Sequence, residues 1–268
     1  MKKIKLFAAI FAIFALLPAV FADDAENVGK DLLKYVEGSA EVIAYADLDA
    51  VLDSKLWKAA ERYSRNAGVY EMAIKAFASE VGLPLSSVCG KAVAWFDGQN
   101  IRGVIGFEDV DSLNAEDTFD MLKSGLRKLA ARDTFELCTY SVRELEIDEC
   151  PALVYTSKWE NEKVKNLFTV IYDNENEIFQ VFIDEKPEAM MNARRKVTRL
   201  ASQIDTDKFF CGVVSGNLIS SGLNEATDGE SGKIFPDGVP VKYIVASVDA
   251  DDKELSVEVK VDISQLVK

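Results

Sequence analysis

The sequence predicts an α+β protein, in which helices pack on one face of one or more mainly antiparallel sheets. Segments of alternating apolar and polar residues recur along the chain, as expected for strands. In the middle of the chain they follow one another with short polar connections, which favours antiparallel pairing because parallel strands need a long crossover. Other segments have apolar residues at helical spacing, but runs of adjacent strands outnumber strict alternation of strand and helix, which favours α+β over α/β.

The beginning of the chain, residues 1–22, has the pattern of a signal peptide. Three lysines precede an apolar run at residues 6–17, and Val20 and Ala22 supply small residues before a cleavage site. A run of about a dozen residues is shorter than the roughly 20 needed to span a bilayer. We therefore expect an exported protein, periplasmic or extracellular, with no stable membrane insertion after cleavage.

The stretch at residues 40–65 is predicted to seed the core. A helix is expected at 25–36, before a strand at 42–47 that is apolar on both sides, as is typical of a central strand covered on both faces. Amphipathic helices are predicted at 49–65 and 70–81.

The next elements are a hairpin, a helix and a meander. The polar turn Asp97-Gly98-Gln99-Asn100 predicts a hairpin between strands at 88–96 and 101–107, since glycine supplies a positive φ. A helix with a clear apolar stripe follows at 119–129. Short connections then separate four predicted strands, at 135–145, 152–159, 167–172 and 177–183.

A further helix is predicted after Pro187, a residue that suits the first helical turn. Its expected buried face consists of Met190, Ala193, Val197, Leu200 and Ile204. It also carries the basic cluster Arg194, Arg195, Lys196 and Arg199. In so acidic a chain this cluster is a candidate site for an anionic partner, although the solvated face of an amphipathic helix explains the same residues.

The end of the chain resembles its beginning in the order of its elements. Residues 209–223 read as a strand, a polar turn and a short apolar helix, which suggests a duplicated unit with a truncated second copy. The main domain would then be 23–205, and a shorter related unit at 206–268 would pack on the same body. The last two strands, at 241–248 and 255–261, are predicted to form a hairpin with one face in solvent.

The chain is acidic, with 45 Asp and Glu against 31 Lys and Arg and a formal net charge of −14. Removal of the lysine-containing signal peptide would make the remainder more negative. Nucleic acid and anionic membranes are bound through clustered positive charge, so the composition argues against both as partners. A solvated acidic surface accounts for the charge.

Four cysteines lie in the exported part, and an even number in an oxidising compartment predicts two disulfides. Three pairings are open. Cys138 with Cys150 closes the shortest loop, which leaves Cys89 for Cys211. The chain has no histidine, and no two cysteines lie two to four residues apart, so the usual zinc spacings are absent.

Asp47, Asp49 and Asp53 form an acidic cluster where the predicted central strand passes into a helix. Two carboxylates could act as general acid and base, but capping of the helix explains these residues more simply. The acidic turns at 173–177 and 249–254 offer oxygens of the kind that calcium prefers, without the glycine and distant glutamate of an EF-hand loop. Ordinary turn chemistry accounts for both.

Motifs for nucleophilic catalysis and for cofactors are absent from the sequence. Ser215 lies one position late for a nucleophile elbow after Gly212, and there is no histidine to act as the usual base for serine or cysteine. No phosphate-binding loop or dinucleotide fingerprint occurs. We therefore expect no catalytic set, no cofactor and no metal.

The opening strand and the residues after it resemble a group of known sequences. Tyr45-Ala46-Asp47-Leu48-Asp49, followed by Leu52 and Ser54-Lys55-Leu56-Trp57, is similar to the opening of uncharacterised secreted bacterial α+β proteins, largely domains of unknown function. In that group such a strand precedes paired helices, and a hairpin like that at 241–262 ends the domain. The resemblance implies a fold and carries over no catalytic residue.

These observations favour a non-enzymatic exported protein that binds a protein, peptide or glycan. The alternative is an acid–base hydrolase with paired carboxylates, acting for instance on polysaccharide, because that chemistry needs neither histidine nor cysteine. A structural role in an envelope assembly is a third interpretation. Two carboxyls facing each other in a deep cleft would favour the hydrolase, whereas an exposed apolar patch would favour binding.

Overall fold

A computed structural model of the chain describes seven segments. They are residues 26–47, 90–107, 115–132, 138–184, 191–226, 240–250 and 255–263. The predicted signal peptide and the helices predicted at 49–65 and 70–81 lie outside the described residues.

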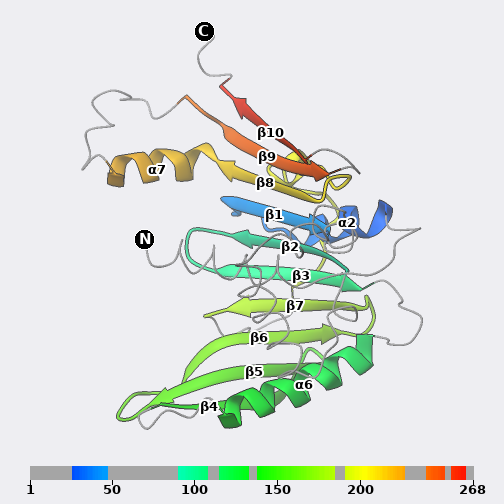
Figure 1. The fold of residues 1–268 in the computed structure, drawn as a ribbon, viewed down its shortest axis with the longest axis vertical. Helices are drawn as coiled ribbons and strands as arrows, with labels where there is room; N and C mark the ends of the chain where they lie inside the picture. The colour runs from blue at the N-terminus through cyan, green and yellow to red at the C-terminus, as the bar shows by residue number, and fades with distance from the viewer. Residues whose placement is uncertain are drawn as a thin grey trace.

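The described strands form one ten-stranded sheet in which neighbouring strands are antiparallel (Figure 1). Their order across the sheet is β10-β9-β8-β1-β2-β3-β7-β6-β5-β4. Their bounds are β1 Val42–Asp47, β2 Gly90–Phe96, β3 Ile101–Phe107, β4 Cys138–Ile147, β5 Cys150–Trp159, β6 Lys165–Asp173, β7 Ile178–Ile183, β8 Phe210–Ser215, β9 Tyr243–Ala250 and β10 Leu255–Asp262. The predicted α+β class with a mainly antiparallel sheet is confirmed.

Strand β1 lies inside the sheet and joins parts of the chain that are far apart in sequence. One of its edges pairs with β2 and the other with β8, where Ala46 is opposite Phe210. Outward from this β1–β8 pair, β2 and β3 follow on one side and β9 and β10 on the other. Tyr45 and Ala46 point to opposite faces and are both buried, so β1 is covered on both sides as its sequence predicts. The parts 23–205 and 206–268 therefore share one sheet, and their duplication stays a prediction.

One face of the sheet packs against the N-terminal helix. Helix α2 (Glu26–Leu32) continues into the 3-10 turn η1 (Leu33–Tyr35) and contacts β2 and β3, in agreement with the helix predicted there. Gly29 allows this close packing, because a Cβ atom at this position would come within 2.9 Å of the Tyr45 hydroxyl oxygen. The large buried side chains of this core include Leu32, Val36, Ile43, Tyr45, Val93, Trp95, Val104, Ile171 and Phe182.

The opposite face packs against α6 (Ala115–Arg132), which lies over β4 and β5 in Figure 1. The Phe119 ring stacks on Tyr172 with centroids 5.8 Å apart and meets Phe179 edge-on. The helices are thus divided between the two faces rather than gathered on one, because both faces of the inner strands are apolar and each needs a cover. Helix α7 (Gly216–Ala226) follows β8, as predicted.

The predicted hairpins and the meander are confirmed. Strands β2 and β3 are joined by the predicted turn, in which Gly98 has a φ of 91°, a value that glycine adopts without strain. Strands β4 to β7 are neighbours in the sheet in the order in which they follow along the chain. Asp148 and Glu149, which join β4 to β5, both have positive φ, as a tight two-residue hairpin turn requires.

The prediction of a helix after Pro187 is wrong for the residues that the structure describes. None of the residues 191–200 is helical, and only the short 3-10 turn η3 (Ala201–Gln203) follows them. Of the predicted buried face, Val197, Leu200 and Ile204 nevertheless pack on the core, together with Met191 and Ala201, whereas Ala193 is exposed. Met190 lies outside the described residues.

The segment is not helical because its N–H groups bond to other parts of the molecule. The N–H of Met191 donates to the Gln180 Oε1 at 2.8 Å, and the N–H of Arg194 donates to the Lys34 carbonyl at 2.7 Å. A backbone N–H that is committed to a tertiary partner cannot also take part in a helical ladder. Tertiary contacts therefore override the helical spacing of the apolar residues.

The predicted disulfides are not formed among the described residues. The free thiols are Cys138, Cys150 and Cys211. The pairing of Cys138 with Cys150 is wrong, because Cys138 is opposite Trp159 at one end of the β4–β5 hairpin and Cys150 is opposite Ile147 at the other. Ten-residue strands at ~3.4 Å per residue separate them by about 30 Å, whereas disulfide Cα atoms lie within about 7 Å. The remaining prediction paired Cys211 with Cys89, which lies outside the described residues.

Candidate functional site

Asp47 is the member of the predicted acidic cluster that the structure describes, since Asp49 and Asp53 lie outside the described residues. It ends β1, and its cross-strand partner on β2 is Lys91. The Asp47 Oδ2 lies 3.7 Å from the Lys91 Nζ, and Lys91 is only 3% exposed. The Asp47 N–H also donates to the carbonyl of Phe209 at 2.9 Å. Because a buried ammonium group needs an opposite charge, this carboxylate holds two strands together.

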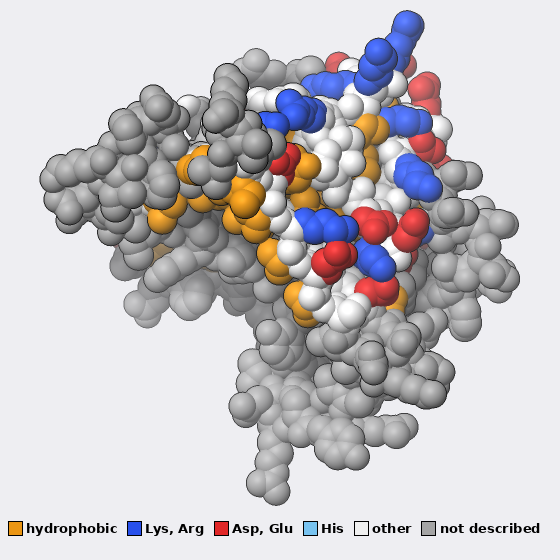
Figure 2. Space-filling model, turned by 90° about the horizontal axis from the view of Figure 1, so that it is seen from above, with side chains coloured by type: hydrophobic (Ala, Val, Ile, Leu, Met, Phe, Trp, Pro, Cys, Tyr) orange, Lys and Arg blue, Asp and Glu red, His pale blue; other side chains and the backbone are white. Residues whose placement is uncertain are grey.

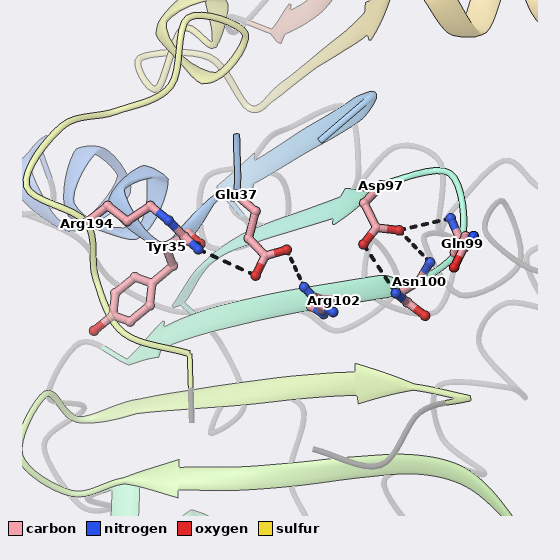
Figure 3. Close-up of polar contacts among 7 residues, drawn as sticks. All are labelled: Tyr35, Glu37, Asp97, Gln99, Asn100, Arg102 and Arg194. Carbon is pink, nitrogen blue, oxygen red and sulfur yellow. Dashed lines mark hydrogen bonds and ion pairs between the residues drawn. The ribbon is translucent and has the colours of Figure 1, made fainter. Parts of the chain in front are cut away.

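The predicted basic patch begins with Arg194, which is bound to the turn after α2 (Figure 3). Its Nη1 donates to the Tyr35 carbonyl at 2.9 Å, and its Nη2 lies 3.5 Å from the Glu37 Oε1. The other oxygen of Glu37 pairs with Arg102 on β3. Arg194 is therefore a structural tie between segments. The other members of the patch, Arg195, Lys196 and Arg199, are exposed like Arg194, and their role in binding stays a prediction.

Asp97 organises the turn between β2 and β3 (Figure 3). Its Oδ1 accepts the N–H groups of Gln99 at 2.9 Å and Asn100 at 2.7 Å, and its Oδ2 accepts the Asn100 Nδ2 at 3.2 Å. Partial burial opposes ionisation, but these hydrogen bonds and the charge of Arg102 outweigh it and lower the pKa of Asp97. The ionised carboxylate thus stabilises the hairpin.

Asp173 organises the acidic turn between β6 and β7 through hydrogen bonds to its side chain. Its Oδ1 accepts the N–H groups of Glu175 and Asn176, each at 3.2 Å, and its Oδ2 accepts the Asn176 Nδ2 at 2.8 Å and the Gln180 Nε2 at 3.5 Å. Both oxygens are therefore engaged within the protein. Among the described residues no three His, Cys, Asp or Glu side chains gather to hold a metal ion. Residues 251–254 of the second acidic turn lie outside the described part.

Two buried thiols and a buried phenol are held in their neutral forms. Burial, and then the charge of Asp173, raises the pKa of Cys150, and burial also raises the pKa of Cys211. Burial and the charges of Asp173 and Asp31 raise the pKa of Tyr35 to about 12. Since the thiolate is the nucleophile, neither of these cysteines is activated.

The last strand exposes a row of apolar side chains. Val257, Val259 and Val261 on β10 are 62%, 60% and 47% exposed. Their cross-strand partners on β9 are also apolar, namely Val248, Ala246 and Ile244. Figure 2 views the molecule from the β10 end of the sheet, and a band of hydrophobic side chains crosses this surface beside groups of charged ones. The apolar row is the candidate binding site.

The other face of β10 is polar, and one of its edges has no partner among the described strands. Glu258 and Lys260 alternate with the valines and form an ion pair at 3.2 Å, with both side chains more than half exposed. In the described part of the chain β10 is the last strand of the sheet and pairs with β9 alone. The sequence predicts one solvated face for this hairpin, yet both faces of β10 are exposed. The alternating pattern carries no sign of which strand will be last in the sheet.

The opposite end of the sheet is protected by charge and by a helix. Helix α6 packs against β4, and Glu144 on this strand pairs with Lys123, at 2.6 Å, and with Arg127. The exposed side chains of β4 are mostly polar or charged, namely Thr139, Ser141, Arg143, Glu144, Leu145 and Glu146. Such features discourage pairing with another chain. The exposed valine row distinguishes β10 from this edge.

Comparisons with known proteins reveal no relative, because no family model, no curated protein and no solved structure matches the chain. The resemblance to secreted bacterial proteins therefore stays a prediction. Among the described residues, no helix combines the length and the apolar character needed to cross a membrane.

Proposed function

We propose that the chain is an exported, non-enzymatic protein that binds a polypeptide partner by taking an extended segment along the open edge of β10. The observation that carries this proposal is the exposed row of Val257, Val259 and Val261 on a strand with one open edge. In strand addition, main-chain hydrogen bonds supply affinity and alternate side chains supply specificity. β-branched side chains across a strand pair stabilise a sheet, which favours a polypeptide over a glycan as the partner.

The order of the sheet supports the same function. Strands β3 and β10 are each the second strand outward from the central β1–β8 pair. Strand β3 continues to β7, which pairs with it along six residues and helps to bury it. In the described sheet β10 has no such neighbour. An added strand would take the place beside β10 that β7 has beside β3.

The alternative of a carboxylate hydrolase has less support among the described residues. Asp47 faces the ammonium group of Lys91, and both oxygens of Asp173 accept hydrogen bonds from their own turn and from Gln180. Neither carboxylate is presented to a substrate as an acid or a base. An exposed apolar surface, in contrast, is a common mark of a protein interaction site.

A labelled peptide with the sequence LSVEVKVDI, that of residues 255–263, tests whether the edge accepts a strand. Fluorescence anisotropy should show saturable binding to the purified chain. The peptide LSVEPKVDI should bind much more weakly, because proline removes a backbone donor.

Two variants of the chain test the location of the binding site. Val259→Lys places a charge in the apolar row and should abolish peptide binding. Val164→Lys is the matched control, because Val164 is 53% exposed in the connection between β5 and β6, and it should bind as the unchanged chain does. No binding of either peptide, or equal binding by both variants, would refute the proposed function.

A further inference from the structure

We infer that the partner at β10 is a second copy of this chain, and that the two β10 strands pair antiparallel about a two-fold axis at Val259. The inference rests on the proposed function and names the partner for that site. It is carried by the sequence of the exposed strand, which is complementary to itself along nearly its whole length when residue 259 lies opposite residue 259.

The apolar face matches itself when residue 259 is placed opposite residue 259. Val257 then lies opposite Val261 of the second copy, and the two-fold axis repeats this pair. Directly opposite side chains in an antiparallel pair are close enough to pack, so these two pairs and the central valine pair form one apolar row. The 47% to 62% exposure of the three valines would fall on both copies.

The charged face selects the same register. Glu258 lies opposite Lys260 of the second copy, and the two-fold axis repeats this pair, so two ion pairs flank the centre. A shift of the axis to Glu258 would place two glutamates opposite each other, and a shift to Lys260 would place two lysines opposite each other. Opposite charges directly across a strand pair stabilise it, whereas like charges destabilise it. A shift of the axis to Val261 would also join apolar pairs with attractive charges, because Lys260 would lie opposite Asp262, but it would pair only residues 260–262 of β10. The register centred on Val259 pairs residues 256–262.

The strand itself is suited to such pairing. Strand β10 runs for eight residues in continuous register with β9 and contains neither proline nor glycine. Bulges, prolines and very short length are among the ways in which proteins block an edge strand, and β10 has none of them. Its charged side chains, Glu258 and Lys260, would face opposite charges in the register centred on Val259. The net charge of −14 repels two copies at long range, but physiological salt largely screens this repulsion between charges more than about 8 Å apart. The interface would be isologous, as in most dimers of identical chains.

Charge variants of the full chain test the register by sedimentation at physiological salt. The unchanged chain should be a dimer, and Glu258→Lys and Lys260→Glu should each be monomeric, because each places like charges opposite each other. An equimolar mixture of these two variants should form a heterodimer, because both lysines of the first variant then lie opposite glutamates of the second. The variant with both changes should again form a dimer with itself.

Cysteine variants test the position of the axis. Two residues at 259 would face each other with Cα atoms about 5 Å apart, within disulfide range, so Val259→Cys should give a reducible covalent dimer. Val257→Cys is the matched control, since two residues at 257 would be about 14 Å apart along the strands and should not cross-link.

The outcomes separate this inference from the proposed function. A monomeric chain, a mixture of charge variants that stays monomeric, or equal cross-linking at positions 257 and 259 would overturn the inference. Peptide binding by a chain that stays monomeric would leave the proposed function standing with another partner. If the peptide does not bind and the chain is also monomeric, both the proposed function and the inference are refuted.

Discussion

Gln180 binds the backbone of Met191, because its Oε1 accepts the Met191 N–H at 2.8 Å while its Nε2 donates to the buried Asp173 at 3.5 Å. Gln180 lies on β7, is fully buried, and so connects the sheet to the segment that crosses it after β7. This side chain satisfies a buried N–H that regular secondary structure would otherwise have to satisfy.

Replacement of Gln180 should therefore destabilise the fold. Gln180→Leu keeps much of the volume but leaves the Met191 N–H without this acceptor, so the free energy of unfolding should fall by about 2 kcal/mol. Urea denaturation measures the change. The control Gln203→Leu alters a partly exposed side chain and should change the free energy by less than about 0.5 kcal/mol. Equal effects of the two changes would contradict a specific role of Gln180.

Arg194 should hold residues 191–204 against the turn after α2. Arg194→Ala removes its bonds to Tyr35 and Glu37, and because these groups are partly exposed we expect a loss of about 1 kcal/mol. Hydrogen exchange should become faster in residues 191–204. Arg195→Ala, at the exposed neighbouring position, should leave exchange unchanged. Faster exchange in both variants would show that the tie is not specific to Arg194.

The pH dependence of stability should reveal the contribution of the Asp97 carboxylate. Its pKa is lower in the folded chain than its ordinary value of 3.8, so its contribution is fully present above that value and is lost as the pH falls through the folded pKa. Asp97→Ala should therefore cost about 1 kcal/mol at pH 7, and the difference from the unchanged chain should narrow in acid. Urea denaturation at pH 7 and pH 3 measures both values. A difference that grew in acid would contradict a lowered pKa of Asp97 in the folded chain.

The thiols provide a direct chemical test. The chain denatured without reductant should release at least three free thiols to Ellman's reagent, from Cys138, Cys150 and Cys211. In the native chain these buried groups should react slowly, and for Cys150 and Cys211 the raised pKa further lowers the fraction of thiolate. A fully reduced sample gives the total for comparison. Two or fewer free thiols in the denatured, unreduced chain would show that a disulfide is present.

Much of the fold is predictable because the relevant signals are local. The residues of β1 are apolar on both sides and become an inner strand, and Gly98 marks a turn because only a few residue types adopt its φ without strain. The spacing of Val197, Leu200 and Ile204 correctly indicates burial but not a helix, because the N–H groups of Met191 and Arg194 bond to distant partners.

The candidate site is harder to predict because it depends on relationships across the sheet. An even number of cysteines does not reveal that Cys138 and Cys150 lie at opposite ends of a hairpin. In the same way, the alternation of Val257 and Glu258 predicts a strand, but the exposure of the valines follows from the position of β10 at the end of the sheet. Asp47 was identified from sequence as an acidic residue at a strand end, while its partner Lys91 had no distinguishing signal.

The pairing of β1 with β8 also constrains how the protein folds. Strand β1 can pair with β2 on one edge early, but its second edge can pair with β8 only after the chain has been synthesised as far as Ser215. Contacts between such distant residues form slowly, because a long loop must close before any of them is gained. During synthesis the apolar strand β1 would thus have an unpaired edge until most of the chain has been made, and such an unpaired edge is prone to aggregation. Folding of the whole sheet after synthesis is complete would avoid that hazard.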